Sequence, residues 1–414
     1  MGMRKMNVLV INGDCVTTNT SANLCHLAYI NGLVDLGCNV TLLSADGKDY
    51  ITDKSMVIPK QVKSYTYYGV TLYEKLSLKK GSGGTASISS FDNTAESKPK
   101  KQSVKSKIIN KAKSIVLASY GVHGIYSKFV KVANKFSSDV SFDYIISIST
   151  PVTSHLIAHN LLKSGKIKGK KWIQIWEDPW FSDVYGFNGK QKIYKEEKRL
   201  LSFAEKVCYV SPITLKNQQN IFPEYAEKMY WQPLPYYYKN EEPKKQYSSK
   251  LVFGYFGAYA PVSRDLEPFY KAAVKCGIDT TICGNPSNLF EPTDNIKIYS
   301  RLPLAKLKPI EDSTNVLVFL CNRKGGQIPG KIYQYSATDK TILFILDGTD
   351  EEKKILREYF EPFNRYVFCE NTEEDIIRAI NLIKGNDLGE VKNQPVEYFN
   401  PQDTIRKILE GESI

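Results

Sequence analysis

The first half of the chain alternates short apolar runs with longer amphipathic stretches. The apolar runs "NVLVIN", "NVTLLSA", "FDYIISIST", "KWIQIWED" and "KVCYVS" have the length and composition of buried strands. Helical periodicity follows at about residues 21–36, 151–163 and 191–205, and Gly37 ends the first of these stretches. Apolar strands that alternate with helices indicate a parallel sheet covered on both faces. We therefore predict a doubly wound α/β domain over residues 1–240.

A polar, lysine-rich segment at residues 239–250 separates this domain from a second set of alternating elements. The later helical stretches lie at about residues 266–276, 304–312, 328–337, 351–360, 372–384 and 402–410. We predict a second Rossmann-like domain over residues 248–397 and a final helix, within 400–414, that packs back onto the first domain. The expected fold class is thus α/β, with two Rossmann-like doubly wound domains facing a central cleft. Ligands of such sheets bind at the carboxyl ends of the strands, so the cleft is the expected site.

Most of the net charge of +12 comes from one segment of the chain, residues 79–135. This segment holds twelve lysines against two acidic residues, Asp92 and Glu96. Residues 79–101 are rich in Gly, Ser and Lys, which predicts a flexible basic insert. The rest of the chain is close to neutral, so we expect one basic surface.

Two amphipathic stretches follow within this basic segment. Their apolar positions are Val104, Ile108, Ala112 and Ile115 in the first, and Ile125, Phe129, Val132 and Phe136 in the second. Lysines fill the remaining faces, a pattern that suits an anionic membrane surface contacted through residues 98–135. A surface helix pair with a solvated lysine face explains the pattern equally well. Nucleic acid is not an expected partner, because the segment has few aromatic residues, no arginine and no nucleic-acid-binding motif.

The cysteines and the hydropathy pattern point to a reducing compartment. The eight cysteines are scattered without a C-x-x-C pair, and most lie in or beside apolar runs, where free Cys packs as a small core residue. The first apolar run is too short for a signal peptide, and no run reaches the length of a membrane span. We expect a cytoplasmic protein, peripheral at the inner face of the cell membrane.

The stretch "NRKGGQIPGKIYQYSATDK" connects a predicted strand to a predicted helix. Gly325 and Gly326 let the backbone approach a ligand closely, because no Cβ intervenes. Pro329 suits the first turn of a helix, whose unpaired N–H groups favour an anion. Lys331 and Gln334 share one helix face. The pattern predicts a phosphate cradle in which Gln327 and Ile328 continue the loop; a tight turn without a ligand is the alternative.

The segment "QIPGKIYQYSATDKTILFI" resembles the donor-binding segment of retaining GT-B glycosyltransferases of the family-4 type. In that family a P-x-K-x-x-E-Y helix precedes a small-residue pair, Gly-Lys-Pro and a strand. The matching residues here are Pro329, Lys331, Tyr335, Ala337 and Lys340. The segment "FGYFGAYAPVSRDLEPFYKA" resembles the opening of the second domain in such enzymes, which implies that Gly257 and Arg264 contact the donor diphosphate.

The chain departs from the family pattern at four positions. Gln334 replaces the Glu that usually binds the nucleotide ribose, and Gly326 stands where an earlier Glu is usual. Residues 339–341 read Asp-Lys-Thr instead of Gly-Lys-Pro. An amide both donates and accepts hydrogen bonds, so Gln334 is still expected to bind the sugar of the nucleotide, without the charge.

The resemblance implies transfer of a glycosyl group from a nucleotide diphosphate sugar to a hydroxyl, with retention of configuration. Negative charge develops on the departing diphosphate, and Arg264, Lys331 and the amides of Gly325 and Gly326 would neutralise it. The chain has no D-x-D triplet, so we expect neither a metal nor another cofactor.

Acceptor contacts are expected from the first domain. The loop "NGDCVTTNTSANLCH" offers Asp14, Asn23 and His26, and Ser21 is a candidate helix N-cap. The segment "WEDPW" offers Trp176 for stacking on a sugar ring and Asp178 for orienting the acceptor hydroxyl. The alternatives are a packed surface imidazole for His26 and a strand-end cap for Asp178.

Together these patterns favour a glycosyltransferase that acts on a lipid-linked glycan in capsule or other cell-surface polysaccharide synthesis. A hexose or an N-acetylhexosamine is the expected sugar. Two alternatives remain: a non-hydrolysing nucleotide-sugar epimerase of the same architecture, and a catalytically degenerate nucleotide-sugar-binding protein, which the Gln334 replacement favours.

Overall fold

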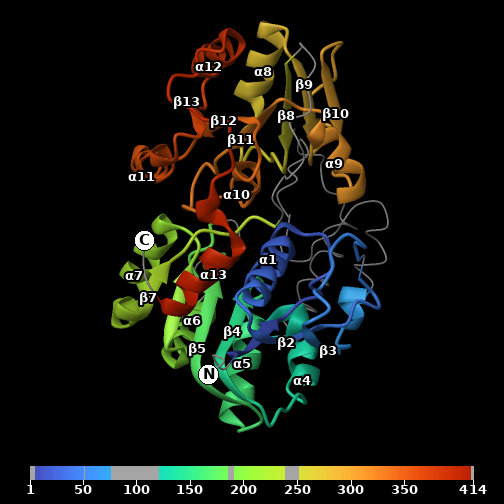
Figure 1. Cartoon of the computed structure of the whole chain (residues 1–414), viewed down its shortest axis with the longest axis vertical. Helices are drawn as coiled ribbons and strands as arrows, with labels where there is room; N and C mark the ends of the chain where they lie inside the picture. Colours follow the sequence, from blue (N-terminus) through green and yellow to red (C-terminus); the bar gives the residue numbers. More distant parts are fainter. Residues whose placement is uncertain (1–4, 51, 76–120, 185–190, 238–250, 412–414) are drawn as a thin grey trace, which may run out of the picture. The chain divides into compact units, whose positions relative to one another are not determined.

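The computed structural model of the 414-residue chain describes residues 5–50, 52–75, 121–184, 191–237 and 251–411. The chain divides into two compact units. Unit 1 comprises Met1–Val210, Thr214–Gln232 and Pro401–Ile414, and unit 2 comprises Ser211–Ile213 and Pro233–Asn400. Both units are built from parallel strands with interleaved helices (Figure 1), as the apolar periodicity predicts.

The described part of unit 1 contains a seven-stranded parallel sheet in the order β3-β2-β1-β4-β5-β6-β7. Its strands are β1 (Asn7–Asn12), β2 (Asn39–Ala45), β3 (Lys63–Tyr67), β4 (Ser141–Ser149), β5 (Lys168–Trp176), β6 (Lys206–Tyr209) and β7 (Met229–Trp231). The helices between them are α1 (Ser21–Asp35), α4 (Ser127–Ala133), α5 (Thr153–Lys163), α6 (Gln191–Phe203) and α7 (Pro212–Ile221), with short 3-10 turns at Gly124–Tyr126 and Pro223–Lys228. The edge strands β3 and β7 were not expected from the sequence. β3 is mostly exposed and polar, so it lacks the apolar signal of a buried strand.

The last helix, α13 (Pro401–Glu410), lies beside α1 within unit 1 (Figure 1). A Cβ at Gly32 would lie 2.3 Å from the carbonyl oxygen of Pro401, so only glycine permits this close approach. Gln402 Nε2 donates to the carbonyl of Asp35 at 3.0 Å, and Tyr230 Oη donates to the carbonyl of Ile408 at 2.7 Å. These contacts hold the C-terminal helix against unit 1, which is formed mainly by the first half of the chain.

The second amphipathic stretch of the basic segment packs into unit 1. Ile125, Phe129 and Phe136 are buried, and the helix α4 packs against β2, β3 and α5. Its apolar side is therefore core, which leaves only the lysine face for an anionic surface. The rest of the segment, residues 79–120, lies outside the described residues.

The described part of unit 2 contains a six-stranded parallel sheet in the order β10-β9-β8-β11-β12-β13. Its strands are β8 (Val252–Phe256), β9 (Asp279–Cys283), β10 (Ile296–Tyr299), β11 (Val316–Leu320), β12 (Thr341–Leu346) and β13 (Tyr366–Glu370). The helices are α8 (Glu267–Cys276), α9 (Leu304–Asp312), α10 (Lys331–Ser336), α11 (Asp350–Phe360) and α12 (Glu373–Gly385), with short 3-10 turns at Glu361–Phe363 and Glu397–Phe399.

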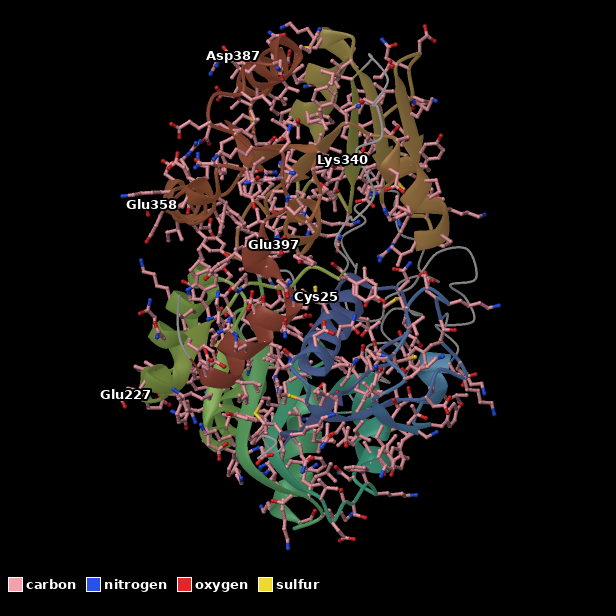
Figure 2. All side chains as sticks on the ribbon, in the orientation of Figure 1. Cys25, Glu227, Lys340, Glu358, Asp387 and Glu397 are labelled. Atoms are coloured by element: carbon pink, nitrogen blue, oxygen red, sulfur yellow. The ribbon has the colours of Figure 1, made fainter. Side chains whose placement is uncertain are left out.

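Several buried polar groups hold unit 2 together. Lys340 is 3 % exposed, and Figure 2 labels it inside the unit, whereas the labelled Glu358 and Asp387 are exposed. Its ammonium donates to the carbonyl of Glu311. Arg365 is also buried and donates to the carbonyls of Thr338 and Lys340. Both cations bind backbone oxygens in the interior, so the matched Lys340 of the family motif is structural in this chain.

No helix among the described residues is both long enough and apolar enough to span a bilayer.

Candidate functional site

Arg264 is fixed at the carboxyl end of the unit 2 sheet. Its Nε donates to Asn322 Oδ1 at 2.7 Å, and its Nη1 donates to the carbonyl of Ala258 at 3.2 Å. Ala258 follows β8 and Asn322 follows β11, which is the next strand of the sheet. The guanidinium thus links the two loops at the edge where Rossmann-like sheets bind their ligands.

The loop after β11 is bonded to the loop after β8 at two further points. The backbone N–H of Arg323 donates to the carbonyl of Ser263 at 2.9 Å. Asn322 Nδ2 donates to the carbonyl of Gln327 at 3.0 Å, which closes the glycine loop back on its own start. Asn322 was not singled out by the sequence, although its position directly after a strand could have suggested it.

Gly257 lies where two strands of unit 2 end in close contact. Its N–H donates to the carbonyl of Cys283 at 3.0 Å, and a Cβ at Gly284 would lie 1.7 Å from the carbonyl oxygen of Gly257. The backbone itself forms this part of the site, and Gly284 is as necessary to it as Gly257.

The glycine pair adopts left-handed backbone, with φ of +97° at Gly325 and +71° at Gly326. The N–H of Gly325 donates to Glu352 Oε1 at 3.2 Å. Glu352 also forms the capping box of α11 with Thr349. The Gly325 amide, which the sequence analysis expected to bind a diphosphate, thus binds the Glu352 carboxylate in this structure. The T-x-x-E pattern predicts the cap, but the contact to Gly325 depends on β11 and β12 being neighbours.

Lys331 is the first residue of α10, because the helix begins at Lys331 and not at 328 as predicted. Its Nζ lies 3.9 Å from Glu311 Oε1 and 5.8 Å from the centroid of the Tyr335 ring. The side chain is 30 % exposed, so it can still reach a ligand. Glu311, on α9, is a partner that the sequence did not reveal.

Two further donor-site predictions of this segment, Ile328 and Gln334, have different surroundings. Ile328 is 7 % exposed, so its side chain packs in the core and only its backbone faces the loop. Gln334 Oε1 accepts a hydrogen bond from the N–H of Tyr237 at 3.0 Å. Gln334 therefore links α10 to the backbone of Tyr237, near the start of the Pro233–Asn400 segment of unit 2.

In unit 1, Asp14 lies two residues after the end of β1. Its Oδ1 accepts from the N–H of Cys15 at 2.7 Å, and its carbonyl accepts from the N–H of Ala45 at 3.1 Å. Burial raises the pKa of Asp14 to about 6, although the Cys15 amide and the nearby His26 both lower it. Asp14 is partly exposed, so it is a titratable group that a ligand can reach.

Asn23 and Ser21 have structural surroundings in the same loop. Asn23 is 1 % exposed, and its Nδ2 donates to the carbonyls of Cys15 and Thr18 at 3.0 and 3.1 Å. The N-cap of α1 is Thr20, whose hydroxyl accepts from the N–H of Asn23, so the expectation that Ser21 caps the helix is wrong. The bonds of Asn23 and Thr20 hold the loop that presents Asp14, whereas Ser21 is exposed.

His26 is completely buried, and its Nε2 lies 3.2 Å from Glu177 Oε2. Glu177 directly follows β5 and is 8 % exposed. The sequence analysis singled out Asp178 and not Glu177; the structure buries Glu177 and leaves Asp178 exposed.

The "WEDPW" segment otherwise differs from the expectation. Trp176 is 0 % exposed, and its indole N–H donates to Gln174 Oε1 at 2.9 Å, so its ring packs in the core and is not available to stack on a sugar. Asp178 is exposed, and its carboxylate lies 3.5 Å from the hydroxyl of Thr150, which follows β4.

Glu74 and Tyr50 add a further acidic contact near Asp14. Tyr50 Oη donates to Glu74 Oε1 at 2.7 Å. Burial raises the pKa of Glu74 to about 7, and Asp14 and Asp49 raise it further. Neither Glu74 nor Tyr50 was a candidate from sequence, because neither belongs to a recognisable motif; Tyr50 lies in a loop and Glu74 in a helical turn.

His155 and His159 are packing residues. His155 is buried with its Nδ1 2.7 Å from Ser147 Oγ, and burial lowers the pKa of His155 to about 3. His159 packs its ring against Phe203 with centroids 4.1 Å apart.

No family model matches the chain, and no curated protein matches it. Solved structures do match over nearly the whole length. A sucrose-phosphate synthase from Thermosynechococcus elongatus has 11% identity and a TM-score of 0.53, covering 98% of this chain and 95% of its own. A glycosyltransferase from Rickettsia africae ESF-5 has 11% identity and a TM-score of 0.53, with coverages of 99% and 94%. The apo form of the lipopolysaccharide outer core galactosyltransferase WaaB has 11% identity and a TM-score of 0.52, with coverages of 98% and 99%. This similarity confirms the predicted fold class, an α/β GT-B fold with two Rossmann-like sheets.

Proposed function

We propose that this protein is a glycosyltransferase that moves a sugar from a nucleotide diphosphate sugar to a hydroxyl group. The observation that carries the proposal is Arg264, fixed by Asn322 and the Ala258 carbonyl at the carboxyl end of the unit 2 sheet. A guanidinium held in place there suits a diphosphate, because it binds phosphate oxygens in a fixed geometry. The three solved glycosyl-transferring proteins that share the fold support the same class of reaction.

In the proposed reaction, Arg264 and Lys331 neutralise the charge that develops on the departing diphosphate. The glycine loop at Gly325 and Gly326 supplies close backbone approach, and Gln334 contacts the nucleotide sugar moiety. No metal or other cofactor is part of the proposal. The diphosphate competes with Glu352 for the Gly325 amide and with Glu311 for Lys331, so binding rearranges these two contacts.

The finer assignments rest on the family resemblance. They are retention of configuration, a hexosyl or N-acetylhexosaminyl donor, and a lipid-linked glycan acceptor in capsule or other cell-surface polysaccharide synthesis. A cytoplasmic site at the inner membrane face fits such an acceptor. Product NMR, which distinguishes the two anomers of the new linkage, tests retention.

Membrane association is proposed through the lysines of residues 98–135, of which 98–120 lie outside the described residues. The physical basis is attraction of clustered lysines to anionic lipid, at about 1 kcal/mol per lysine near the surface. Sedimentation with anionic liposomes should be lost after deletion of residues 98–113. Unchanged sedimentation of the deletion variant removes this part of the proposal.

Two measurements test the transferase proposal. The first incubates the protein with a panel of nucleotide sugars and follows free nucleotide and sugar isomers. Slow hydrolysis of one donor supports a transferase, isomerisation indicates an epimerase, and neither indicates a binding protein.

The second measurement is calorimetric titration with uridine and guanosine diphosphates. Arg264→Ala should weaken the affinity of the preferred nucleotide at least tenfold, since a charge-assisted hydrogen bond contributes about 1.5–3 kcal/mol. Arg378→Ala is the matched control, because Arg378 is an exposed arginine of α12 in the same unit. If neither nucleotide binds the wild type, the proposed function is wrong.

A further inference from the structure

The amino edge of the unit 1 sheet, where its parallel strands begin, carries a strongly basic stretch of chain. Residues 163–171 run from the last residue of α5 to the fourth residue of β5 and contain no acidic residue. They contain five lysines, all exposed: Lys163, Lys166, Lys168, Lys170 and Lys171. This stretch lies outside the basic segment, residues 79–135, that the sequence analysis singled out.

The fold brings this stretch beside the lysines of α4. The N–H of Ser138 donates to the carbonyl of Lys166 at 2.9 Å, and the ammonium of Lys166 donates to the carbonyl of Asn134. Asn134 is the C-cap of α4, and Lys131 and Lys135 near it are both exposed. Two basic stretches that are separate in sequence therefore form one surface, which we call the lysine edge.

The carboxylates at the lysine edge are fewer than its lysines. Asp143 lies 2.8 Å from the ammonium of Lys170, and Glu205 accepts from the N–H of Trp172 at 2.6 Å. Asp139 is exposed. These three carboxylates stand against the seven exposed lysines of residues 131–171, so the edge is positively charged.

A hollow of about 470 Å³ lies at the same edge, among the amino ends of β1, β2, β3 and β4. Two exposed lysines, Lys5 and Lys63, line it. Its apolar lining includes Val140, which is 41 % exposed, and Phe142. Val140 belongs to the connection between α4 and β4 that is bonded to the α5–β5 connection, so the hollow adjoins the lysine edge.

The kind of cation favours a phosphate-covered surface over a nucleic acid. Residues 5–198 contain no arginine, so the cations of the lysine edge and the hollow are all lysines. Base edges are commonly read by the planar fork of arginine, whereas a lysine ammonium is a point charge on a flexible stem. Clustered lysines are typical of protein surfaces that contact anionic lipid. Ammonium groups beside apolar side chains suit a lipid headgroup, in which phosphate adjoins hydrocarbon.

We propose that the amino edge of unit 1 docks on an anionic lipid bilayer, with the lysine edge against the headgroups and one headgroup phosphate between Lys5 and Lys63. This inference deepens the membrane association proposed above and rests on it, but it does not depend on transferase activity. The lysine edge adds to the attraction that residues 98–120 supply, so either part alone binds more weakly. The carboxyl edge lies at the other end of the nine-residue β5, roughly 30 Å away at about 3.3 Å per residue, so the contact leaves it open to ligands.

The triple variant Lys163→Gln/Lys168→Gln/Lys171→Gln tests the lysine edge while leaving residues 98–135 intact. In the full chain it should lower partition onto vesicles of phosphatidylglycerol and phosphatidylcholine about a hundredfold, because each lysine near the surface contributes about fivefold. Sedimentation of the vesicles measures the partition. High salt should release the wild type, since the attraction is electrostatic.

The matched control is Lys192→Gln/Lys195→Gln/Lys216→Gln. These three lysines are exposed on α6 and α7 of the same unit, so the control removes the same charge from a different surface. It should partition like the wild type. Urea unfolding followed by tryptophan fluorescence verifies that unit 1 is folded in both triple variants.

Cys38 lines the hollow and can report on contact with lipid. Only Cys38 and Cys276 among the eight cysteines, all of which the structure describes, are not buried, so Cys276→Ser leaves Cys38 as the accessible thiol. Vesicles that contain phosphatidylglycerol should slow alkylation of Cys38 by a maleimide at least fivefold, and pure phosphatidylcholine vesicles should not. Adding Lys5→Gln/Lys63→Gln should abolish this protection.

The outcomes separate this contact from the wider proposal. If the wild type sediments with the anionic vesicles and the Lys163/Lys168/Lys171 variant sediments equally well, or if bound vesicles leave Cys38 alkylation unchanged, only the docking of the amino edge is overturned. If the wild type binds dissolved polyphosphate but no vesicles, the edge serves a soluble polyanion and the membrane contact is wrong. If the wild type binds neither, the membrane association fails as a whole, whereas the transferase proposal is decided separately by nucleotide binding.

Discussion

The imidazole of His26, in the first helix of unit 1, lies 3.2 Å from the carboxylate of Glu177, which follows the fifth strand. Both side chains are buried, so the pair joins α1 to the loop that presents Asp178 at the carboxyl edge of the sheet. A buried pair of this kind contributes little net stability as a pair, but the loss of one partner leaves the other charge without compensation.

His26→Leu should therefore lower the free energy of unfolding of unit 1 by about 3 kcal/mol. Glu177→Gln in the His26→Leu background should recover at least about 1 kcal/mol, because it removes the uncompensated carboxylate. All four tryptophans (Trp172, Trp176, Trp180 and Trp231) belong to unit 1, so urea denaturation followed by tryptophan fluorescence measures this unit alone. Equal effects of Glu177→Gln in both backgrounds would show that the two residues are not coupled.

Glu352→Gln should strengthen nucleoside diphosphate binding several-fold. The carboxylate accepts from the Gly325 amide at 3.2 Å, so its negative charge opposes a diphosphate at the same place. The variant should also lower stability by about 1 kcal/mol, because the single oxygen of Gln cannot accept from both the Gly325 and the Thr349 N–H groups, as the two oxygens of Glu352 do. Calorimetry with uridine and guanosine diphosphates measures the first effect, and Glu351→Gln, an exposed neighbour on α11, is the control. Weaker binding by Glu352→Gln contradicts this account.

Gln334→Glu tests the departure from the family motif. Either residue can accept from the Tyr237 N–H, now at 3.0 Å, so the thermal midpoint of unfolding should stay the same. A carboxylate binds ribose hydroxyls more strongly than an amide does, so the affinity for the preferred nucleoside diphosphate should rise about tenfold. An unchanged affinity shows that this side chain does not contact the nucleotide.

Gly284→Ala should disturb the donor side without touching any charged residue. The new Cβ would lie 1.7 Å from the carbonyl oxygen of Gly257, so the ends of β8 and β9 must separate. We expect a loss of stability of about 2 kcal/mol or more and at least tenfold weaker nucleotide binding. Gly385→Ala, where a Cβ meets nothing within 4 Å, is the matched control and should change neither quantity appreciably. Wild-type binding by Gly284→Ala places the nucleotide elsewhere.

Glu197 makes the stability of unit 1 depend on pH. It is 0 % exposed, its Oε2 accepts from the N–H of Phe181 at 2.6 Å, and burial raises the pKa of Glu197 to about 7. A carboxyl whose folded pKa lies above its unfolded value, 4.5, contributes stability that is complete below pH 4.5 and is lost as pH rises through 7.

The urea concentration at the unfolding midpoint of wild-type unit 1 should therefore decrease as the pH is raised from 5.5 to 8, because this interval contains the pKa of about 7. Glu197→Gln keeps an oxygen that accepts from Phe181 but cannot ionise, so this fall should shrink. Asp14 and Glu74 have raised pKa values as well and leave a residual slope. The same slope in Glu197→Gln and wild type contradicts the assignment.

The sequence by itself determined the architecture. Short apolar runs that alternate with 3.6-residue periodicity predict parallel strands covered by helices, and the structure has both sheets of this kind. The glycine loop at Gly325 and the position of Arg264 after β8 were also readable, because each depends on the order of a few adjacent residues.

The tertiary structure alone decided the partners of these residues. That Glu352 bonds to Gly325, that Glu311 lies near Lys331 and that Glu177 pairs with His26 depends on which strands are neighbours and on their register. Local pattern does not encode this, since Glu177 and Asp178 are adjacent in sequence and only the fold buries the first and exposes the second. Periodicity determines where a chain forms strands and helices, but residues far apart in sequence meet only through packing. Packing therefore decided which candidate side chains remain accessible and which, like Trp176, lie in the core.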